Sequence, residues 1–160
     1  MKISLEVNGV SLELESHIDQ PQLMEAGFKK VDIFTRLFLP FQKKKGDIIF
    51  FVKNPTITVF NNKVKAVANL DTSMGADTMN GTSCFAIFNQ DRLRYIICQV
   101  MQGNIAAPLF AKDVRQAALN ELGEPTAATG GLKLWQEGKQ TFKSVIDPSG
   151  RNAFIHWLTE

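Results

Sequence analysis

The chain has 160 residues, of which 44% are hydrophobic, and this is enough apolar material for a packed core and excludes a disordered or fibrous chain. Its apolar runs are too short to span a bilayer, and Glu6 and Asn8 interrupt any secretory leader pattern, so we expect a cytoplasmic protein. The net charge of +2 is too small to indicate nucleic-acid binding by itself.

Charge is unevenly distributed along the first third of the chain. Residues 1–28 contain five acidic residues against Lys2, whereas residues 29–53 contain seven basic residues against Asp32 and Asp47. The simplest interpretation is a solvated acidic face near a solvated basic one, and a dipole that binds a partner is the alternative.

Residues 3–15 (ISLEVNGVSLELE) alternate strictly on both sides of Asn8-Gly9, which predicts a β-hairpin with a two-residue turn. The alternation places Glu6, Glu13 and Glu15 together on the polar face. These glutamates are either simply solvated or available to a cationic partner. The buried face would hold the apolar residues Ile3, Leu5, Val7, Val10, Leu12 and Leu14.

Pro21 and Gly27 predict the start and the left-handed end of a short helix. Residues 28–42 fit a helical and an extended pattern equally well, so periodicity does not decide between them. A basic KKKG turn follows, then a central strand over residues 47–53 and a hairpin of residues 56–60 and 63–70 across Asn61-Asn62.

Residues 71–83 (DTSMGADTMNGTS) form the one long segment that is rich in turn residues and has no apolar period. We expect either a connecting loop or a binding loop, with Met74, Asp77 and Met79 as its contact residues.

Strands are predicted at residues 84–88 and 92–101, around a turn at residues 89–91. With a three-residue turn, Cys84 and Cys98 would be directly opposed at a disulfide-compatible separation, and with a two-residue turn they would face opposite sides of the sheet. In a reducing cytoplasm we expect a reduced, buried pair.

A helix is predicted from residue 110 to about residue 122, because Gly123 and Pro125 terminate it. Its buried stripe would contain Phe110, Val114, Ala117, Ala118 and Leu122, and its outward face Lys112, Arg115, Gln116 and Asn120.

The last predicted strands cover residues 132–136, 140–146 and 152–158. A type I turn at residues 147–150 with a bulge at Gly150 would pair Phe142 with His156. This register places Phe142, Ile146, Phe154 and Leu158 on one face. It leaves Trp157 on the other face, near Lys143, where either a partner or a second layer of the core would cover it.

The order hairpin, glycine-terminated helix, strand and hairpin occurs twice, in residues 1–70 and 84–160, with residues 71–83 as the connection. The helix ends share the pattern Leu-x-Glu-x-Gly, at residues 23–27 and 119–123. We therefore predict an α+β fold of antiparallel sheet with one or two helices packed on one face, arranged as a probable tandem ββαβββ repeat that could pack as one domain.

Catalytic chemistry is not indicated. The two histidines, His17 and His156, have no cysteine or carboxylate at ligand spacing, and Gly130-Gly131 leads into a strand and not into a phosphate-binding helix. We expect no catalytic residues, no metal and no cofactor.

The run VRQAALNELGEP, followed by a strand that contains a tryptophan, resembles the helix-LGxP-strand element of small bacterial two-layer proteins. These include β-lactamase inhibitor proteins, the small lipoprotein of outer-membrane β-barrel assembly and some bacteriocin immunity proteins, and a tandem repeat fits the inhibitor and immunity proteins better. The resemblance covers residues 110–158. It implies a non-enzymatic protein that binds another protein, a toxin or an enzyme, and blocks it by occlusion.

The residues expected to contact such a partner are Glu6, Glu13, Glu15, Met74, Asp77, Met79, Lys143 and Trp157. One alternative is a carrier of a small apolar ligand or a lipid, with a cavity lined by Phe28, Phe34, Phe38, Phe50 and Phe60. A second alternative is a structural component of an envelope or phage assembly.

Overall fold

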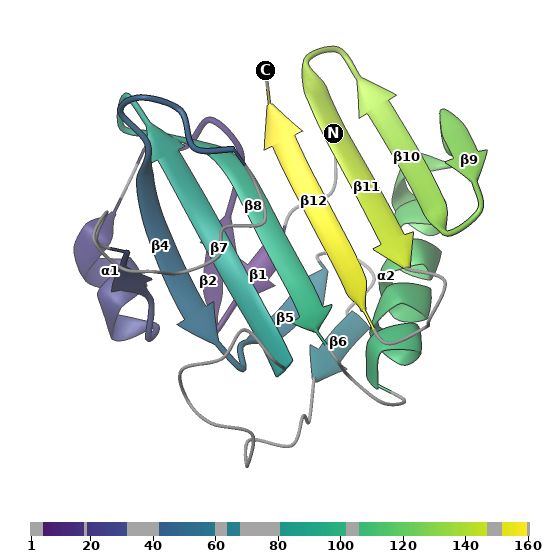
Figure 1. The fold of residues 1–160 in the computed structure, drawn as a ribbon, viewed down its shortest axis with the longest axis horizontal. Coiled ribbons are helices and arrows are strands. Elements are labelled where there is room, and N and C mark those ends of the chain that lie inside the picture. The colour runs from purple at the N-terminus through teal and green to yellow at the C-terminus, as the bar shows by residue number, and fades with distance from the viewer. Residues whose placement is uncertain are drawn as a thin grey trace.

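A computed structural model describes residues 5–17, 19–31, 42–59, 64–67, 81–101, 106–146 and 152–159 (Figure 1). Within these residues the chain forms two antiparallel sheets and two helices, which confirms the α+β prediction. Met74, Asp77 and Met79 lie outside the described residues, as do Phe34, Phe38, Phe60 and the ambiguous residues 32–41.

The smaller sheet has the strand order β2-β1-β5-β6. Its first hairpin is formed by β1 (Leu5–Val7) and β2 (Val10–Leu12), and its second by β5 (Thr56–Val59) and β6 (Val64–Val67). Both central turn residues of the first hairpin are left-handed, with φ of 50° at Asn8 and 80° at Gly9, as a primed turn requires. The predicted pairing of both hairpins is confirmed.

The larger sheet has the strand order β3-β4-β7-β8-β12-β11-β10-β9. Its strands are β3 (Lys29–Lys30), β4 (Ile48–Lys53), β7 (Gly81–Asn89), β8 (Arg92–Met101), β9 (Ala127–Thr129), β10 (Leu132–Glu137), β11 (Gln140–Ile146) and β12 (Ala153–Thr159). Strand β7 begins at Gly81, so the expected loop over residues 71–83 ends earlier than predicted.

The two segments of the expected repeat contribute to the same sheet, because β4 pairs with β7 from Ile48↔Phe88 to Lys53↔Ser83. The first segment therefore supplies β3 and β4 to the larger sheet and the other four strands to the smaller one. Its helix has 6 residues, whereas that of the second segment has 17. The tandem repeat stays a prediction.

Helix α1 (Gln20–Glu25) has the predicted ends. The Asp19 side chain accepts a hydrogen bond from the Gln22 amide at 3.1 Å, Pro21 lies in the first turn, and Gly27 follows the helix with φ of 96°.

Helix α2 (Ala106–Leu122) begins four residues earlier than predicted. Pro108 falls in its first turn, where the missing amide proton has no helical partner to lose, so the proline does not exclude an earlier start. The helix ends as predicted, since Gly123 has φ of 79°. The Trp135 indole donates a hydrogen bond of 2.9 Å to the Gly123 carbonyl and so satisfies a terminal acceptor of the helix.

Arg115 does not point outward as predicted. Its Nε donates to Ser144 Oγ at 3.1 Å, and its Nη2 donates to the carbonyl oxygens of Ser144 and Gly131. The guanidinium thus ties α2 to the β10–β11 end of the larger sheet, and burial lowers the pKa of Arg115. Three stripe residues of α2, namely Val114, Ala117 and Ala118, are fully buried.

The larger sheet has two different faces. Its inner face is covered by α2 and the smaller sheet, which lie behind it in Figure 1, and supplies most of the core. The opposite, outer face points to the viewer in Figure 1 and carries a separate small cluster of buried side chains: Ile49, Phe85, Ile87 and Ile97.

The register of the last hairpin differs by one residue from the prediction. Phe142 pairs with Trp157 instead of His156, and Ile146 pairs with Ala153, which leaves six residues between the strands. A one-residue shift transfers every side chain of a strand to the other face. Trp157 therefore lies on the inner face, where it is 2% exposed. Burial of its large apolar surface in the core favours this register.

The turn between β7 and β8 contains two residues, Gln90 and Asp91, and not three. A β-bulge between Ile87 and Phe88 then shifts the register, so Cys84 and Cys98 are directly opposed despite the shorter turn. Both cysteines are free and buried, as expected.

Candidate binding surface

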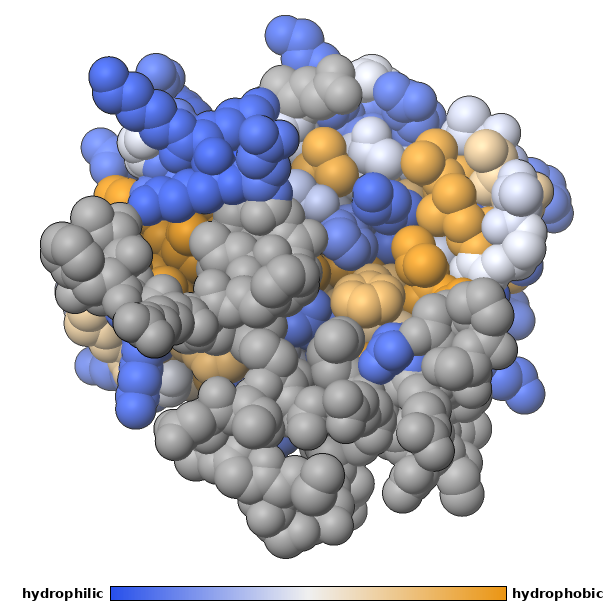
Figure 2. All heavy atoms as spheres, viewed as in Figure 1, coloured by the Kyte–Doolittle hydropathy of each residue, from blue (hydrophilic) through white to orange (hydrophobic). Residues whose placement is uncertain are grey.

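The outer face of the larger sheet carries a band of aromatic and aliphatic side chains over β8, β12, β11 and β10. Pairing places them on one face, because Leu158 is opposite Tyr95, Phe154 is opposite Val145, and His156 is opposite Lys143. All are half-buried. We call this set the outer patch; its members are Tyr95, Leu134, Lys143, Val145, Phe154, His156 and Leu158. Figure 2 shows hydrophobic side chains beside polar ones over β10, β11 and β12.

The charged residues described on or beside this face are mostly basic. Lys143 lies within the outer patch, and Lys29 is paired with Phe51, so it shares the outer face. The turn that precedes β4 adds the exposed residues Lys43, Lys44 and Lys45 and forms the strongly hydrophilic region at the upper left of Figure 2.

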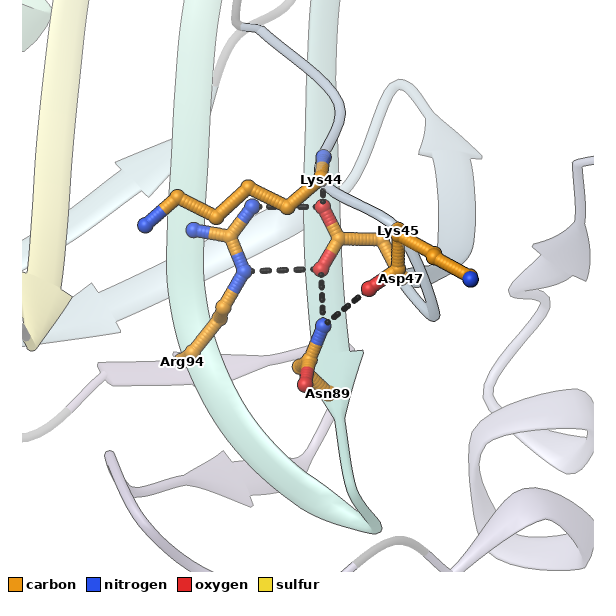
Figure 3. A network of polar contacts seen from close by, with 5 residues as sticks. All are labelled: Lys44, Lys45, Asp47, Asn89 and Arg94. Carbon is orange, nitrogen blue, oxygen red and sulfur yellow. Dashed lines mark hydrogen bonds and ion pairs between the residues drawn. The ribbon is translucent and has the colours of Figure 1, made fainter.

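A buried aspartate fixes this basic turn to the sheet (Figure 3). Asp47 Oδ1 accepts from Arg94 Nε at 2.8 Å, and Oδ2 accepts from Arg94 Nη2 at 2.5 Å, which is a bidentate ion pair. The Asn89 amide donates to Oδ1 at 2.9 Å, and the Lys44 backbone N–H donates to Oδ2 at 2.7 Å. The Asp47 side chain is fully buried, and that of Arg94 is 16% exposed.

The network keeps Asp47 ionised. Burial by itself would raise the pKa of this carboxyl, but the hydrogen bonds from Arg94, Asn89 and the Lys44 amide, with the charge of Arg94, outweigh it and hold the pKa at about 2. Lys44 donates its hydrogen bond to Asp47 from the backbone N–H, so its side-chain ammonium group takes no part in this bond.

Arg94 reaches Asp47 from the β-bulge. Phe88 pairs with Leu93 and Ile87 with Tyr95, so Arg94 is the extra residue of β8. Bulges often redirect one side chain in this way. The guanidinium carbon also lies 5.9 Å from the centre of the Tyr95 ring, so the bulge connects the basic turn to the outer patch.

His156 is held by Tyr95 within the outer patch, since the Tyr95 hydroxyl lies 2.6 Å from His156 Nδ1. Burial, together with the charge of Lys143, lowers the pKa of His156 to about 4. The imidazole is therefore neutral at pH 7 and forms one hydrogen bond with the Tyr95 hydroxyl through Nδ1. Burial also raises the pKa of Tyr95.

The structure separates the predicted contact residues. Lys143 is on the outer face and Trp157 on the inner face, so they cannot contact one partner together as expected from the predicted register. Glu6 lies on β1 of the smaller sheet, where it pairs with Ser11. Glu13 is exposed beyond the end of β2.

The backbone at Glu15 is left-handed, with φ of 70°, so this residue does not continue the extended conformation of β2. Its carboxylate accepts a hydrogen bond of 3.3 Å from the Thr159 hydroxyl, and its carbonyl accepts one of 3.0 Å from Arg92. This residue therefore joins the first hairpin to the last strand and to β8.

Tyr95, Phe154 and His156 were not predicted as surface residues. The alternation of the last strand was visible, but the wrong register assigned Phe154 to the core side. The available signal was Trp157, because a tryptophan is a large apolar side chain that a strand tends to bury. If Trp157 faces the core, its neighbours His156 and Leu158 face the opposite side of the sheet.

No protein-family model, curated protein or solved structure matches the chain. Among the described residues, no helix has the length and apolar character needed to cross a membrane. Within the same part of the chain, no three or more side chains of His, Cys, Asp or Glu are grouped so as to hold a metal ion.

Proposed function

We propose that this chain is a non-enzymatic binding module that uses the outer patch to bind another protein and to occlude part of its surface. The observation that carries the proposal is the outer patch, in which the Tyr95–Leu158 pair and the Val145–Phe154 pair lie on either side of His156 and Lys143, on a sheet face that neither α2 nor the smaller sheet covers. An inhibitor or immunity protein is the class that this mode of binding fits best.

The composition of the outer patch supports a protein partner. Aromatic side chains with a polar group, such as Tyr95, are enriched at interfaces because they bury a large area and still form a hydrogen bond. They lose little conformational entropy on binding, and the Tyr95–His156 hydrogen bond reduces this loss further.

The charge of the surroundings favours an acidic partner. Lys143 lies inside the patch, and Lys43, Lys44 and Lys45 lie on the turn that Asp47 attaches to the same sheet. Such groups accelerate association with a negatively charged surface, and the effect decreases as salt screens it. The basic side of the molecule thus replaces the acidic hairpin as the proposed contact region.

The described phenylalanines of the carrier alternative are part of the packed core. Phe28 is 2% exposed and Phe50 is fully buried. The Phe50 ring packs edge-on against the Phe88 ring, with 5.8 Å between the two ring centroids. Side chains packed in this way favour a solid core over a ligand cavity.

The test compares three variants in capture from an extract of the source cells, followed by calorimetry with the captured protein after purification. Lys143→Glu and Phe154→Ala change the outer patch, and Glu13→Lys is the matched control on the acidic hairpin. We expect one stoichiometric partner whose affinity falls about 30-fold or more in each patch variant. Binding should remain within about threefold in the control, because an exposed charge remote from an interface contributes little.

Two results would contradict the proposal. Unchanged affinity in both patch variants, with loss of binding in Glu13→Lys, would transfer the interface to the acidic hairpin. No captured protein, together with an apolar small molecule that mass spectrometry detects in the purified chain, would favour the carrier. Thermal melting of each variant establishes that the fold is intact before either result is interpreted.

A further inference from the structure

The two cysteines of this chain meet in the core. Cys84 on β7 and Cys98 on β8 are directly opposed, and their sulfur atoms are 3.1 Å apart. A disulfide bond is ~2.05 Å long, so a movement of about 1 Å separates the two thiols from a covalent bond. The chain contains 2 cysteines in total, so each has only the other as an intrachain partner.

The opposition of the two thiols depends on the bulge. The pairing of Asn89 with Arg92 at the two-residue turn would set the register of the whole hairpin if there were no bulge. In that register Cys84 and Cys98 would lie on opposite faces of the sheet. The extra residue Arg94 restores the alignment, and Asp47 holds Arg94 in place. The alignment of the cysteine pair thus depends on the bulge, which the Asp47–Arg94 ion pair supports.

We propose that Cys84 and Cys98 are a modification site at which the chain forms a cross-strand disulfide when it folds in the presence of a low-molecular-weight disulfide. One thiolate attacks the small disulfide and releases one small thiol, which leaves a mixed disulfide on the protein. The second cysteine attacks the protein-bound sulfur of that mixed disulfide and releases the second small thiol. The protein is oxidised by two electrons, the small disulfide is reduced by two, and both thiol protons end on the released thiols.

The folded state controls the timing of this reaction. Both side chains have 0% exposure, and burial, with the neighbouring Cys98, raises the pKa of Cys84. Because exchange requires an accessible thiolate, the bond forms before the core closes over the hairpin, and the finished disulfide is then shielded from reductants. This site is independent of the proposed binding function, since both cysteines lie on the inner face.

The test is refolding of the denatured, reduced wild-type chain in a buffer of oxidised and reduced glutathione, with refolding under excess reductant as the reference. We expect a mass lower by two hydrogen atoms, protection of both cysteines from alkylation in denaturant, and a proteolytic peptide that joins residues 84 and 98. The disulfide would close a loop between residues that are 14 positions apart. For a loop of this length, we expect the melting temperature of the oxidised protein to be about 10 °C higher than that of the reduced form.

The folded reduced protein, treated with the same glutathione mixture, should react far more slowly than the denatured chain. Cys84→Ala and Cys98→Ala provide controls that should gain a single glutathione adduct at most. If the wild-type chain refolds to its native melting profile with both thiols still open to alkylation, or with one glutathione on each cysteine, the proposal is overturned. This result requires no variant to fold and says nothing against protein binding through the outer patch.

Discussion

Asp47 is the residue on which the attachment of the basic turn depends. It is fully buried, and every hydrogen bond described for its carboxylate comes from β7, β8 or its own turn. A buried ion pair adds little net stability compared with an apolar pair, but removal of one partner leaves the other charge unpaired in a medium that solvates it poorly.

Asp47→Asn should therefore destabilise the fold by about 3 kcal/mol, because the Arg94 guanidinium loses its counter-ion while it is only 16% exposed. Urea unfolding monitored by tryptophan fluorescence measures the change. Lys44→Ala is the matched control, since Lys44 bonds Asp47 through its backbone N–H, and it should change stability by less than about 0.5 kcal/mol. Equal losses in the two variants would show that the lysine side chain, and not the buried pair, holds the turn.

Three elements meet at Asn8, which occupies the turn of the first hairpin. Its amide nitrogen donates to the Ala26 carbonyl at the end of α1 at 2.8 Å, and its side-chain oxygen accepts from the Thr56 amide of β5 at 2.9 Å. The backbone N–H also donates to the Thr56 carbonyl at 2.9 Å. One residue thus supplies the left-handed conformation of a hairpin and connects that hairpin to a helix and a second strand.

Two substitutions separate these roles. Asn8→Gly keeps the left-handed φ but removes both side-chain hydrogen bonds, and we expect a loss of about 1 to 2 kcal/mol. Asn8→Ala should lose about 1 kcal/mol more, since alanine also carries the strain of φ at 50°. Denaturant unfolding of both variants checks the order. A glycine variant as stable as the wild type would mean that water replaces both side-chain bonds.

The elements with local signals were predictable from the sequence. Asn8-Gly9 specifies its own turn, and Gly123 with Pro125 specifies the end of α2, because these residues act through their own backbone geometry. Strand register is not local in the same sense. The bulge at Arg94 and the six-residue connection before Ala153 set registers that bury apolar side chains on the inner face. No single turn residue encodes such a register.

The candidate site was predictable only in part, for the same reason. Lys143 was identified, but its assumed neighbour Trp157 is buried on the opposite face, and the residues that do surround Lys143 include His156 and Phe154. Arg115 was also misassigned, because a period count places it outside the apolar stripe but cannot show that its guanidinium reaches the carbonyls of Ser144 and Gly131.

At the scale of the whole molecule, two titratable groups on the larger sheet link stability to pH in the same direction. His156 has its pKa lowered from 6.5 to about 4, and Asp47 from 3.8 to about 2. In both windows the unfolded chain binds more protons than the folded one, so stability decreases as pH falls. The loss from His156 develops between about pH 6.5 and 4, and that from Asp47 follows between about pH 4 and 2.

The free energy of unfolding should consequently decrease by about 1 kcal/mol per pH unit between pH 6 and 4.5, where His156 is the group that resists protonation in the fold. In His156→Gln this slope should largely disappear, because glutamine does not titrate and can still form a hydrogen bond with Tyr95. The matched control is His17→Gln, which makes the same replacement at an exposed histidine outside the outer patch. Urea unfolding at half-unit pH intervals measures all three profiles. A slope that survives in His156→Gln would assign the acid sensitivity to the carboxylates, and the neutral, Tyr95-bonded imidazole would then have no part in it.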